Sequence, residues 1–425
     1  MASSHRILVL LLLLATVPRV GALWMRSESL LSDPDGYRGI AHRLATEGVY
    51  GRAIRGETRP TAFRPPLYPI CLAGLELTFG PGKASIAAFH LVLGLATVLL
   101  SYWTVARFLN PISSFVAALL VAADPILLQQ SSLVMTETLA TFLIILVLYL
   151  LTRPASGNKA IHWTLIGVAL GLAALCRPPF VGFGCVVIAV LAMRKLHSKE
   201  ASWRGVCLVA VSMLITVAPW IVRNQIQFGR PMMTTTHGGY TLWLGNNQGF
   251  YEYLRGSNWW WKAWDSAELD SQSLAILRKH EFSEIESDRE HYQNAYRAIA
   301  DEPAMFGLSC LVRVQRLWGF FPYQLTEYGS TGKRLLIAAI GLWYLGVLAF
   351  ALIGLLRIRR RWRESPWLWG ILLCLVITGV HAFFWSNLRM RAPLMPFVAM
   401  LAAVGAQSFS KGTGRADETP GKTSL

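Results

Sequence analysis

Two carboxylates stand close together in the segment that follows the first apolar stretch of the chain. The sequence "SDPDGY" carries them as Asp33 and Asp35. A carboxylate held just outside a hydrocarbon layer can act as a general base toward a hydroxyl group. Asp33 followed by Pro34 also predicts a helix start, with Asp33 as the N-cap. Both interpretations stay open, because a capping carboxylate is held rigidly enough to take part in chemistry.

Arginines recur in the segments that we predict to face the same side as these acids. Arginines that face outward run against the usual bias toward the inner side of a membrane. Each alone could anchor a helix end at the membrane interface. Together they predict an anion site, since the planar guanidinium group binds phosphate through two hydrogen bonds. The candidates are Arg64 in "FRPPLYP", Arg177 in "CRPPF", Arg223 in "PWIVRNQ", and Arg389 and Arg391 in "WSNLRMR".

Further polar side chains flank these segments. Glu137 in "VMTETLA" stands at a predicted helix start, where the helix dipole favours an acid. The segment "THGGYTLWLGNNQGFYEY" holds His237, Asn246 and Asn247 among aromatic residues. Amides and flat apolar rings are what sugar recognition requires, although the segment could also be an ordinary loop. We take these four residues as candidates for sugar or acceptor binding, and we predict no metal site and no cofactor.

The elements that must position these residues are membrane helices. The chain has 425 residues, of which 54% are hydrophobic and only 15% are charged. Apolar runs near the length that spans a bilayer, roughly 20 residues, occur about ten times. We therefore predict an all-α polytopic membrane protein, a bundle of about ten (eight to twelve) transmembrane helices. The runs are 7–24, 84–108, 113–128, 137–152, 161–176, 179–194, 204–222, 334–356, 366–385 and 392–408. The first could instead be a cleaved signal peptide.

The runs divide the chain into four parts. An N-terminal transmembrane module (1–222) contains the first outer loop (25–83), and a small extracytoplasmic or membrane-surface domain (223–333) follows. C-terminal transmembrane helices (334–408) precede a disordered cytoplasmic tail (409–425). Within the outer domain, Ser283 and Glu286 form a capping box that starts a helix. The run 305–322 predicts an amphipathic helix lying on the membrane surface.

The net charge of +16 does not indicate a nucleic-acid partner. It results from 40 basic and 24 acidic residues. The basic clusters at 194–199 and 357–363 both fall in loops predicted to face the cytoplasm, as the positive-inside rule requires. The partners that remain are the lipid bilayer and anionic lipid-linked molecules.

In their order, several of these segments resemble the GT-C membrane glycosyltransferases, in particular bacterial protein O-mannosyltransferase-like and lipid A aminoarabinose transferase-like enzymes. The segments are "DPDGYRGIAHRLATEGVYG", "FRPPLYPICLAGLELTFG", "MTETL", "GLAALCRP", "PWIVRNQIQFGRP" and "GGYTLWLGNN". The resemblance implies that Asp33, four residues before Tyr37, is the catalytic carboxylate, and that Arg64 contacts the phosphate of the lipid carrier. Pro34 and Phe63 stand where many relatives have Glu.

The resemblance further implies transfer of a sugar from a polyprenyl-phosphate donor to a glycan, lipid or protein acceptor, with inversion at the anomeric carbon. The expected location is the cytoplasmic (inner) membrane, with the site facing the periplasm. A flippase for a lipid-linked glycan and a non-catalytic scaffold are the alternatives. In this interpretation Asp33 and Asp35 are catalytic, and Glu137, His237, Asn246 and Asn247 bind sugar or acceptor. The donor phosphate would contact Tyr37, Arg64, Arg177, Arg223, Arg389 and Arg391.

Overall fold

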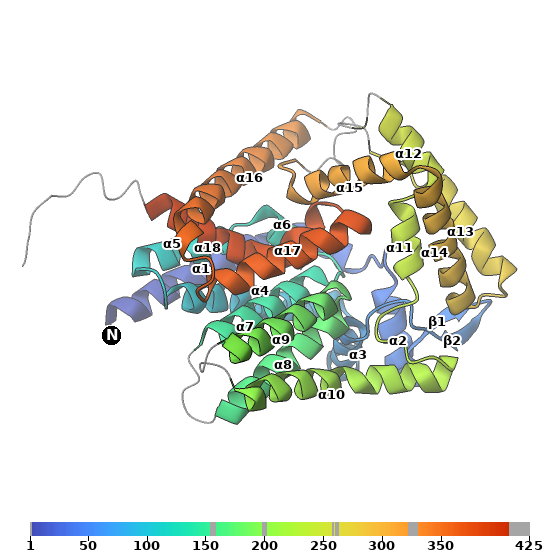
Figure 1. Ribbon diagram of the computed structural model, residues 1–425, viewed down its shortest axis with the longest axis horizontal. Helices are drawn as coiled ribbons and strands as arrows, with labels where there is room; N and C mark the ends of the chain where they lie inside the picture. Colours follow the sequence, from blue (N-terminus) through green and yellow to red (C-terminus); the bar gives the residue numbers. More distant parts are fainter. Residues whose placement is uncertain are drawn as a thin grey trace, which may run out of the picture.

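The computed structural model describes residues 2–153, 159–197, 202–256, 259, 263–321 and 330–407. The predicted disordered tail at 409–425 lies outside these ranges. Each of the ten predicted apolar runs is helical, in agreement with the predicted all-α fold (Figure 1). The helices are α1 (Ala2–Met25), α4 (Lys83–Val105), α5 (Pro111–Ala122) with α6 (Pro125–Ser131), α7 (Glu137–Thr152), α8 (Lys159–Cys176), α9 (Pro179–His197), α10 (Trp203–Phe228), α16 (Thr331–Arg357), α17 (Trp367–Phe383) and α18 (Met395–Ala406).

Within the described ranges, seven helices are long and apolar enough to cross a membrane, or eight if the bent pair α5–α6 counts as one span. The helices α7 and α17 are apolar but shorter. The predicted spans at 137–152 and 366–385 correspond to these two, so the predicted runs are all accounted for.

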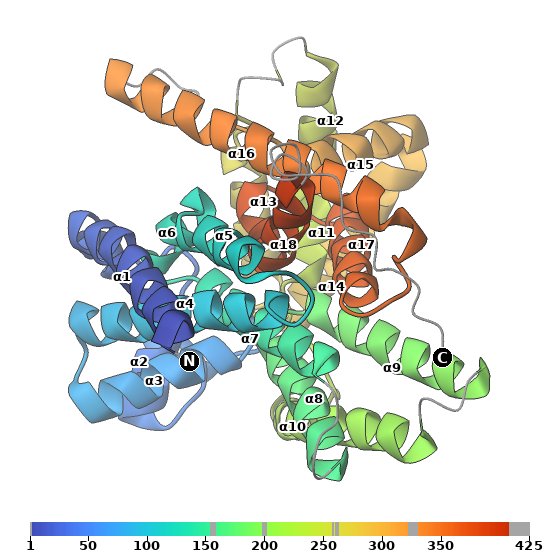
Figure 2. The ribbon, with the colours of Figure 1, turned by 90° about the vertical axis from the view of Figure 1, so that its left-hand side faces the viewer.

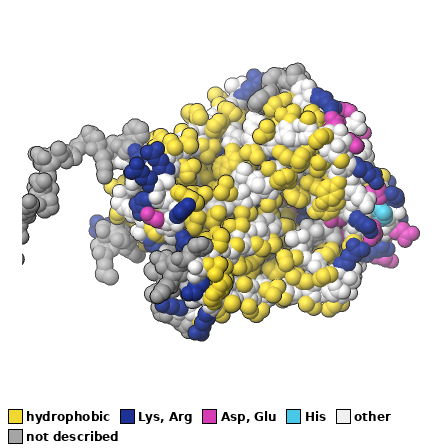
Figure 3. Space-filling view, viewed as in Figure 1, with side chains coloured by type: hydrophobic (Ala, Val, Ile, Leu, Met, Phe, Trp, Pro, Cys, Tyr) yellow, Lys and Arg dark blue, Asp and Glu magenta, His cyan; other side chains and the backbone are white. Residues whose placement is uncertain are grey.

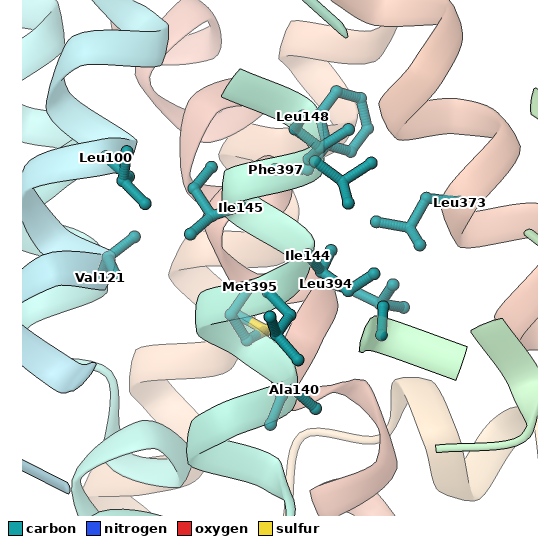
Figure 4. Close-up of a cluster of buried hydrophobic side chains, with 14 of the residues drawn as sticks. Leu100, Val121, Ala140, Ile144, Ile145, Leu148, Leu373, Leu394, Met395 and Phe397 are labelled. Carbon is teal, nitrogen blue, oxygen red and sulfur yellow. The ribbon is translucent and has the colours of Figure 1, made fainter. Parts of the chain in front are cut away.

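Helix α7 lies inside the bundle, between α4 and α8 (Figure 2). A helix that is apolar on every side is one that its neighbours surround. Side chains from α4, α5, α17 and α18 close around it (Figure 4). The packed residues include Leu100, Val121, Ala140, Ile144, Ile145, Leu148, Leu373, Leu394, Met395 and Phe397. This packing fixes the position of Glu137, the first residue of α7.

The first outer loop is folded. It contains the short 3-10 helix η1 (Ser27–Leu30), α2 (Tyr37–Glu47), an antiparallel hairpin of β1 (Gly51–Ile54) and β2 (Glu57–Pro60), and α3 (Leu67–Phe79). Helix α2 begins at Tyr37 rather than at Pro34, because Gly36 adopts a left-handed conformation with φ of 76° and turns the chain into the helix. Pro65 and Pro66 precede α3, and Pro66 is the N-cap residue of this helix, with a fixed φ of −78° that suits a helix start.

The outer domain is helical and begins later than predicted. Helix α10 runs on to Phe228 and ends at Gly229, whose φ of 68° suits a helix C-terminus, so the first residues of the predicted domain 223–333 belong to α10. The domain then contains α11 (Gly238–Leu244), α12 (Gln248–Arg255), α13 (Ala267–Lys279), α14 (Glu284–Asp301) and α15 (Pro303–Trp318). Ser283 caps α14, as the sequence predicts.

The run 305–322, predicted as an amphipathic helix, is helical over its described part as α15, and both of its arginines are buried inside the domain. Arg313 is fully buried and donates to the carbonyl oxygens of Ala382 (2.8 Å) and Gly245. The guanidinium carbon of Arg316 lies 5.4 Å from the centroid of the Phe250 ring and 5.6 Å from that of Tyr253, and the side chain is 6% exposed. Both arginines therefore hold α15 against its neighbours, because free carbonyls and aromatic faces inside the domain satisfy their charges.

The charged side chains gather at two poles, with an apolar band between them (Figure 3). Lys and Arg dominate the pole where α5 begins and α16 ends. Acids and bases mix at the other pole, which α2, the hairpin and α11–α14 form. A protein surface with this pattern suits a bilayer that surrounds the apolar band.

Candidate active site

Asp33 and Asp35 point to different neighbours although only one residue separates them. The two carboxylate oxygens of Asp33 accept the backbone N–H groups of Arg38 (3.0 Å) and Gly39 (2.8 Å) at the start of α2. Asp35 instead accepts a hydrogen bond from Arg64 Nη2 (2.8 Å). The turn at Gly36 separates the two directions. Asp33 therefore anchors the helix start, and Asp35 faces the arginines.

Arg64 contacts Asp35 twice. Its Nε donates to the backbone carbonyl of Asp35 (2.8 Å), and its Nη2 pairs with the carboxylate. Arg389 approaches the second carboxylate oxygen of Asp35 from the loop between α17 and α18, with its Nη1 at 3.7 Å. Segments more than 300 positions apart in the chain thus meet at one carboxylate.

Glu137 lies close to Arg177 and Arg389. Its Oε1 lies 2.9 Å from Arg177 Nη1 and 3.6 Å from Arg389 Nε. Its side chain is only 2% exposed. Within the described part of the chain, Glu137 Oε2 has no hydrogen-bond partner. A buried oxygen without a partner is unusual in a finished fold and indicates a place that a ligand or water completes.

We call Asp35, Arg64, Glu137, Arg177 and Arg389 the arginine–carboxylate cluster. Three guanidinium groups face two carboxylates, which leaves one net positive charge. Its arginines keep donors that the carboxylates do not use, because a guanidinium group has five N–H donors and these ion pairs occupy only some of them. The arrangement can accept an additional singly charged anion.

Tyr37 lies beside the cluster. Its ring is 5.4 Å from the Arg64 guanidinium carbon and meets Tyr68 edge-on. Burial raises the pKa of Tyr37 to about 12, and the nearby Arg64 offsets only part of this effect. Tyr37 therefore contributes a neutral hydroxyl group, which can donate a hydrogen bond.

Two of the predicted phosphate-binding arginines bind the protein itself. Arg223 donates to the backbone carbonyls of Thr61 (2.8 Å) and Tyr50 (2.8 Å), so it ties the base of the hairpin to α10. Arg391 is fully buried and donates to the carbonyl of Gly319 (2.6 Å). The structure does not bring Arg223 or Arg391 into the cluster.

Of the residues predicted to bind sugar or acceptor, His237 lies beside the cluster. His237 stacks on Tyr240 and lies 4.4 Å, between ring centroids, from Phe63, next to Arg64 in sequence. Burial, with the neighbouring positive charges of Arg64 and Arg52, holds the pKa of His237 well below its usual range. His237 is therefore neutral and lies beside the site.

Asn246 and Asn247 are buried in the outer domain. Asn246 donates to the carbonyls of Leu242 (2.8 Å) and Phe383 (3.1 Å) and accepts from Arg313. Asn247 caps α12. The protein uses these amide groups internally, and they are not part of the cluster.

Sequence reasoning missed a set of buried polar residues inside the bundle. Arg19, in α1, is 1% exposed and donates to the carbonyls of Ala122 (2.8 Å) and Val121 (3.3 Å), which the bend between α5 and α6 leaves free. Asp124, which caps α6, accepts the Tyr344 hydroxyl (3.0 Å). Ionisable residues within predicted spans were a signal that could have identified Arg19 and Asp124.

Comparison with known proteins gives a family match over part of the chain. Residues 63–222 match the family described as dolichyl-phosphate-mannose-protein mannosyltransferase. This range begins one residue before Arg64 and includes Glu137 and Arg177. A search of curated proteins gives no match.

Solved structures match nearly the whole chain. The Archaeoglobus fulgidus oligosaccharyltransferase in its apo form has a TM-score of 0.54 and 15% identity, over 96% of this chain and 50% of that one. The same organism's oligosaccharyltransferase AglB, in complex with an inhibitory peptide and a dolichol-phosphate, has a TM-score of 0.54 and 14% identity, over 98% and 52%. The chain has the GT-C fold.

The chain spans about half the length of these two GT-C structures. ArnT from Cupriavidus metallidurans bound to undecaprenyl phosphate also aligns, with a TM-score of 0.44 and 14% identity over 95% of this chain and 77% of that one, and the fold assignment does not depend on it. In this chain, the folded first outer loop, the starts of α7 and α9 and the loop between α17 and α18 meet at one pole. The cluster forms there because these segments carry its side chains.

Proposed function

We propose that the protein is a membrane glycosyltransferase that moves a sugar from a polyprenyl-phosphate donor to an acceptor outside the membrane. The observation that carries this proposal is the arginine–carboxylate cluster, which has one net positive charge and unsatisfied polar atoms. The match to a mannosyltransferase family and the GT-C fold support it. The donor phosphate would bind Arg64, Arg177 and Arg389, with Tyr37 as an additional donor.

The charge of the cluster matches each stage of such a transfer. A sugar linked to a lipid through a phosphodiester carries one negative charge, which the single positive charge of the cluster balances. Transfer releases a lipid phosphate with a second negative charge. If a cluster carboxylate takes the acceptor proton in the same step, the cluster gains one positive charge and the balance holds. Fixed cations aimed at charge that develops in a transition state are a principal source of catalysis.

We assign the role of general base to Asp35. It is the acid that contacts Arg64, and its side chain is 22% exposed, so an acceptor hydroxyl can reach it. The donor phosphate would bind the edges of the Arg64 and Arg389 guanidinium groups that Asp35 leaves open. Attack by the acceptor oxygen on the face opposite the phosphate inverts the anomeric carbon. The resemblance implies that Asp33 is the catalytic carboxylate. In this proposal Asp33 instead holds the loop that carries Asp35.

The remaining predicted residues receive supporting roles. Glu137 holds Arg177 and Arg389 at the phosphate. His237, neutral and flanked by Phe63 and Tyr240, is placed to contact the sugar or the acceptor. Arg223, Arg391, Asn246 and Asn247 would hold the loops around the site. The basic pole would face the cytoplasm of the inner membrane and the cluster the periplasm, as the positive-inside rule favours.

The experiment uses membranes that contain the full chain and undecaprenyl-phosphate mannose labelled in the sugar. Transfer appears as label in material other than the donor, which also distinguishes transfer from transport. We expect Arg389→Gln to abolish most of this label, while Arg59→Gln, which changes an exposed arginine on the first outer loop, leaves it unchanged. Equal labelling with both variants, or label that moves without a new covalent product, would contradict the proposal.

A further inference from the structure

A cavity of about 520 Å³ lies at the basic pole, far from the arginine–carboxylate cluster. Arg107 lines the cavity and shows where it lies. This arginine donates to the Tyr149 carbonyl (2.8 Å) and the Thr152 hydroxyl (3.1 Å), which are both at the end of α7. Glu137 of the cluster stands at the opposite end of the same helix. The loop between α4 and α5, the end of α16 and the end of α18 enclose the cavity.

The polar part of the cavity wall is basic. Arg107, Arg357 and Arg361 line it, together with the amides of Asn110 and Gln407. Arg361 pairs with Glu364 (2.8 Å). In the part of the chain that the structure describes, neither Arg107 nor Arg357 forms an ion pair; Arg357 donates to the Val404 carbonyl (3.2 Å). Among the described residues, the charges of these two guanidinium groups are therefore uncompensated.

The other half of the cavity wall is apolar, and the protein surface beside the cavity also exposes apolar side chains. Phe108, Leu109, Ile358, Trp367 and Val404 line the cavity. Next to it, Leu356 on α16 is 58% exposed and Ile112 on α5 is 76% exposed. A free, fully hydrated anion gains nothing from such a wall, whereas an amphipathic anion contacts both halves.

We propose that this cavity binds the headgroup of an anionic phospholipid from the adjacent leaflet, with its acyl chains along α16 and α5. The phosphate would lie on Arg107 and Arg357, because guanidinium groups bind phosphate oxygens in pairs. The uncompensated charge favours a net anionic headgroup over a zwitterionic one. Basic pockets between membrane helices on the cytoplasmic side bind headgroups in this way. The bound lipid would join the α4–α5 loop to the ends of α16 and α18. The proposal is independent of the enzymatic function.

The experiment measures lipid retention by the purified full chain in detergent, by native mass spectrometry with phosphatidylglycerol and with phosphatidylcholine. We expect tighter retention of phosphatidylglycerol. Arg107→Gln/Arg357→Gln, which removes the two guanidinium groups that would hold the phosphate, should weaken it by about 10- to 30-fold, from the typical contribution of each basic residue near a lipid surface. The matched control Lys195→Gln/Arg204→Gln removes two charges from the same pole outside the cavity and should retain phosphatidylglycerol like the unmodified chain.

Two results would overturn the proposal. Equal affinity of the unmodified chain for both lipids would show no anionic headgroup site, and this comparison does not depend on whether a variant folds. An equal loss of phosphatidylglycerol in the cavity variant and the control variant would show general attraction to the basic pole. Inorganic phosphate is added in a separate arm: displacement of the lipid by millimolar phosphate would assign the cavity to a free anion, whereas no displacement supports the lipid.

Discussion

Replacement of the two neighbouring acids separates their roles. In Asp35→Asn the cluster loses its base, and we expect transfer to fall by about 10²–10⁴-fold, the usual contribution of general base catalysis. In Asp33→Asn the new side chain can still accept one of the two N–H groups of Arg38 and Gly39. The cost is about 1 kcal/mol of stability, and transfer should stay within about threefold of the unmodified rate, a change of under 1 kcal/mol.

We expect Asp35→Asn to have the opposite effect on binding of the lipid product, undecaprenyl phosphate, and to strengthen it. Asp35 Oδ1 lies 2.8 Å from Arg64 Nη2, so a phosphate on another edge of that guanidinium would be about 6 Å from the carboxylate. Two unit charges at about 6 Å repel by about 3 kcal/mol at an effective dielectric constant of about 20. With partial exposure and salt we expect about 1–2 kcal/mol. Asp35→Asn should therefore bind undecaprenyl phosphate about 5- to 30-fold more tightly while transfer falls.

The assay pairs labelled-sugar transfer with titration of undecaprenyl phosphate into each purified variant, after thermal melts have shown that both variants fold. A structural defect would lower transfer and binding together, so the divergence is specific to the electrostatic argument. If Asp33→Asn loses transfer and Asp35→Asn keeps it, Asp33 is the base and our assignment from the contacts is refuted.

Three further results are expected. Arg64→Ala should weaken binding of undecaprenyl phosphate about 10- to 150-fold, because a charge-assisted hydrogen bond contributes about 1.5–3 kcal/mol; Arg64→Lys should recover part of this, and equal affinities for all three would contradict the assignment. Arg313→Met leaves the buried oxygens of Ala382 and Asn246 without their donor, so the melting temperature should fall by an amount equivalent to about 1–3 kcal/mol, while the exposed Arg297→Met stays within about 0.5 kcal/mol. Burial raises the pKa of Asp288 from 3.8 to about 6, so the folded chain holds this proton where the unfolded chain has lost it and stability falls as the pH rises from about 4 to about 6; Asp288→Asn should flatten melting temperature against pH in that window, and an unchanged slope would exclude this residue as the cause.

Much of the fold could be predicted because hydrophobicity acts locally. An apolar run near the thickness of a bilayer has to form a helix that satisfies its own backbone, whatever its neighbours are. The runs therefore gave the helices, and their alternation gave the side of each loop. That reasoning was enough to predict that Arg64, Arg177 and Arg389 share a face with the acids, and the ion pairs bring these three together.

Loop and helix-end details could not be predicted in the same way. Arg313 and Arg316 looked like the polar face of a surface helix, yet free carbonyls and aromatic rings from segments distant in sequence enclose them. Arg19 lies within the first predicted apolar run, and it satisfies carbonyls that the bend after α5 exposes. In both cases the partner that satisfies the charge comes from another part of the chain, and no local pattern encodes it.

The sequence by itself determined that acids and arginines would meet at one side of a helical bundle, since burial of apolar runs fixes the topology. Only the tertiary structure decided that Asp35 and not Asp33 faces the arginines, and that Glu137 joins them while Arg223 and Arg391 do not. The physical reason is directional. The turn at Gly36 and the rotation of each packed helix set where a side chain points, and packing against distant segments determines both.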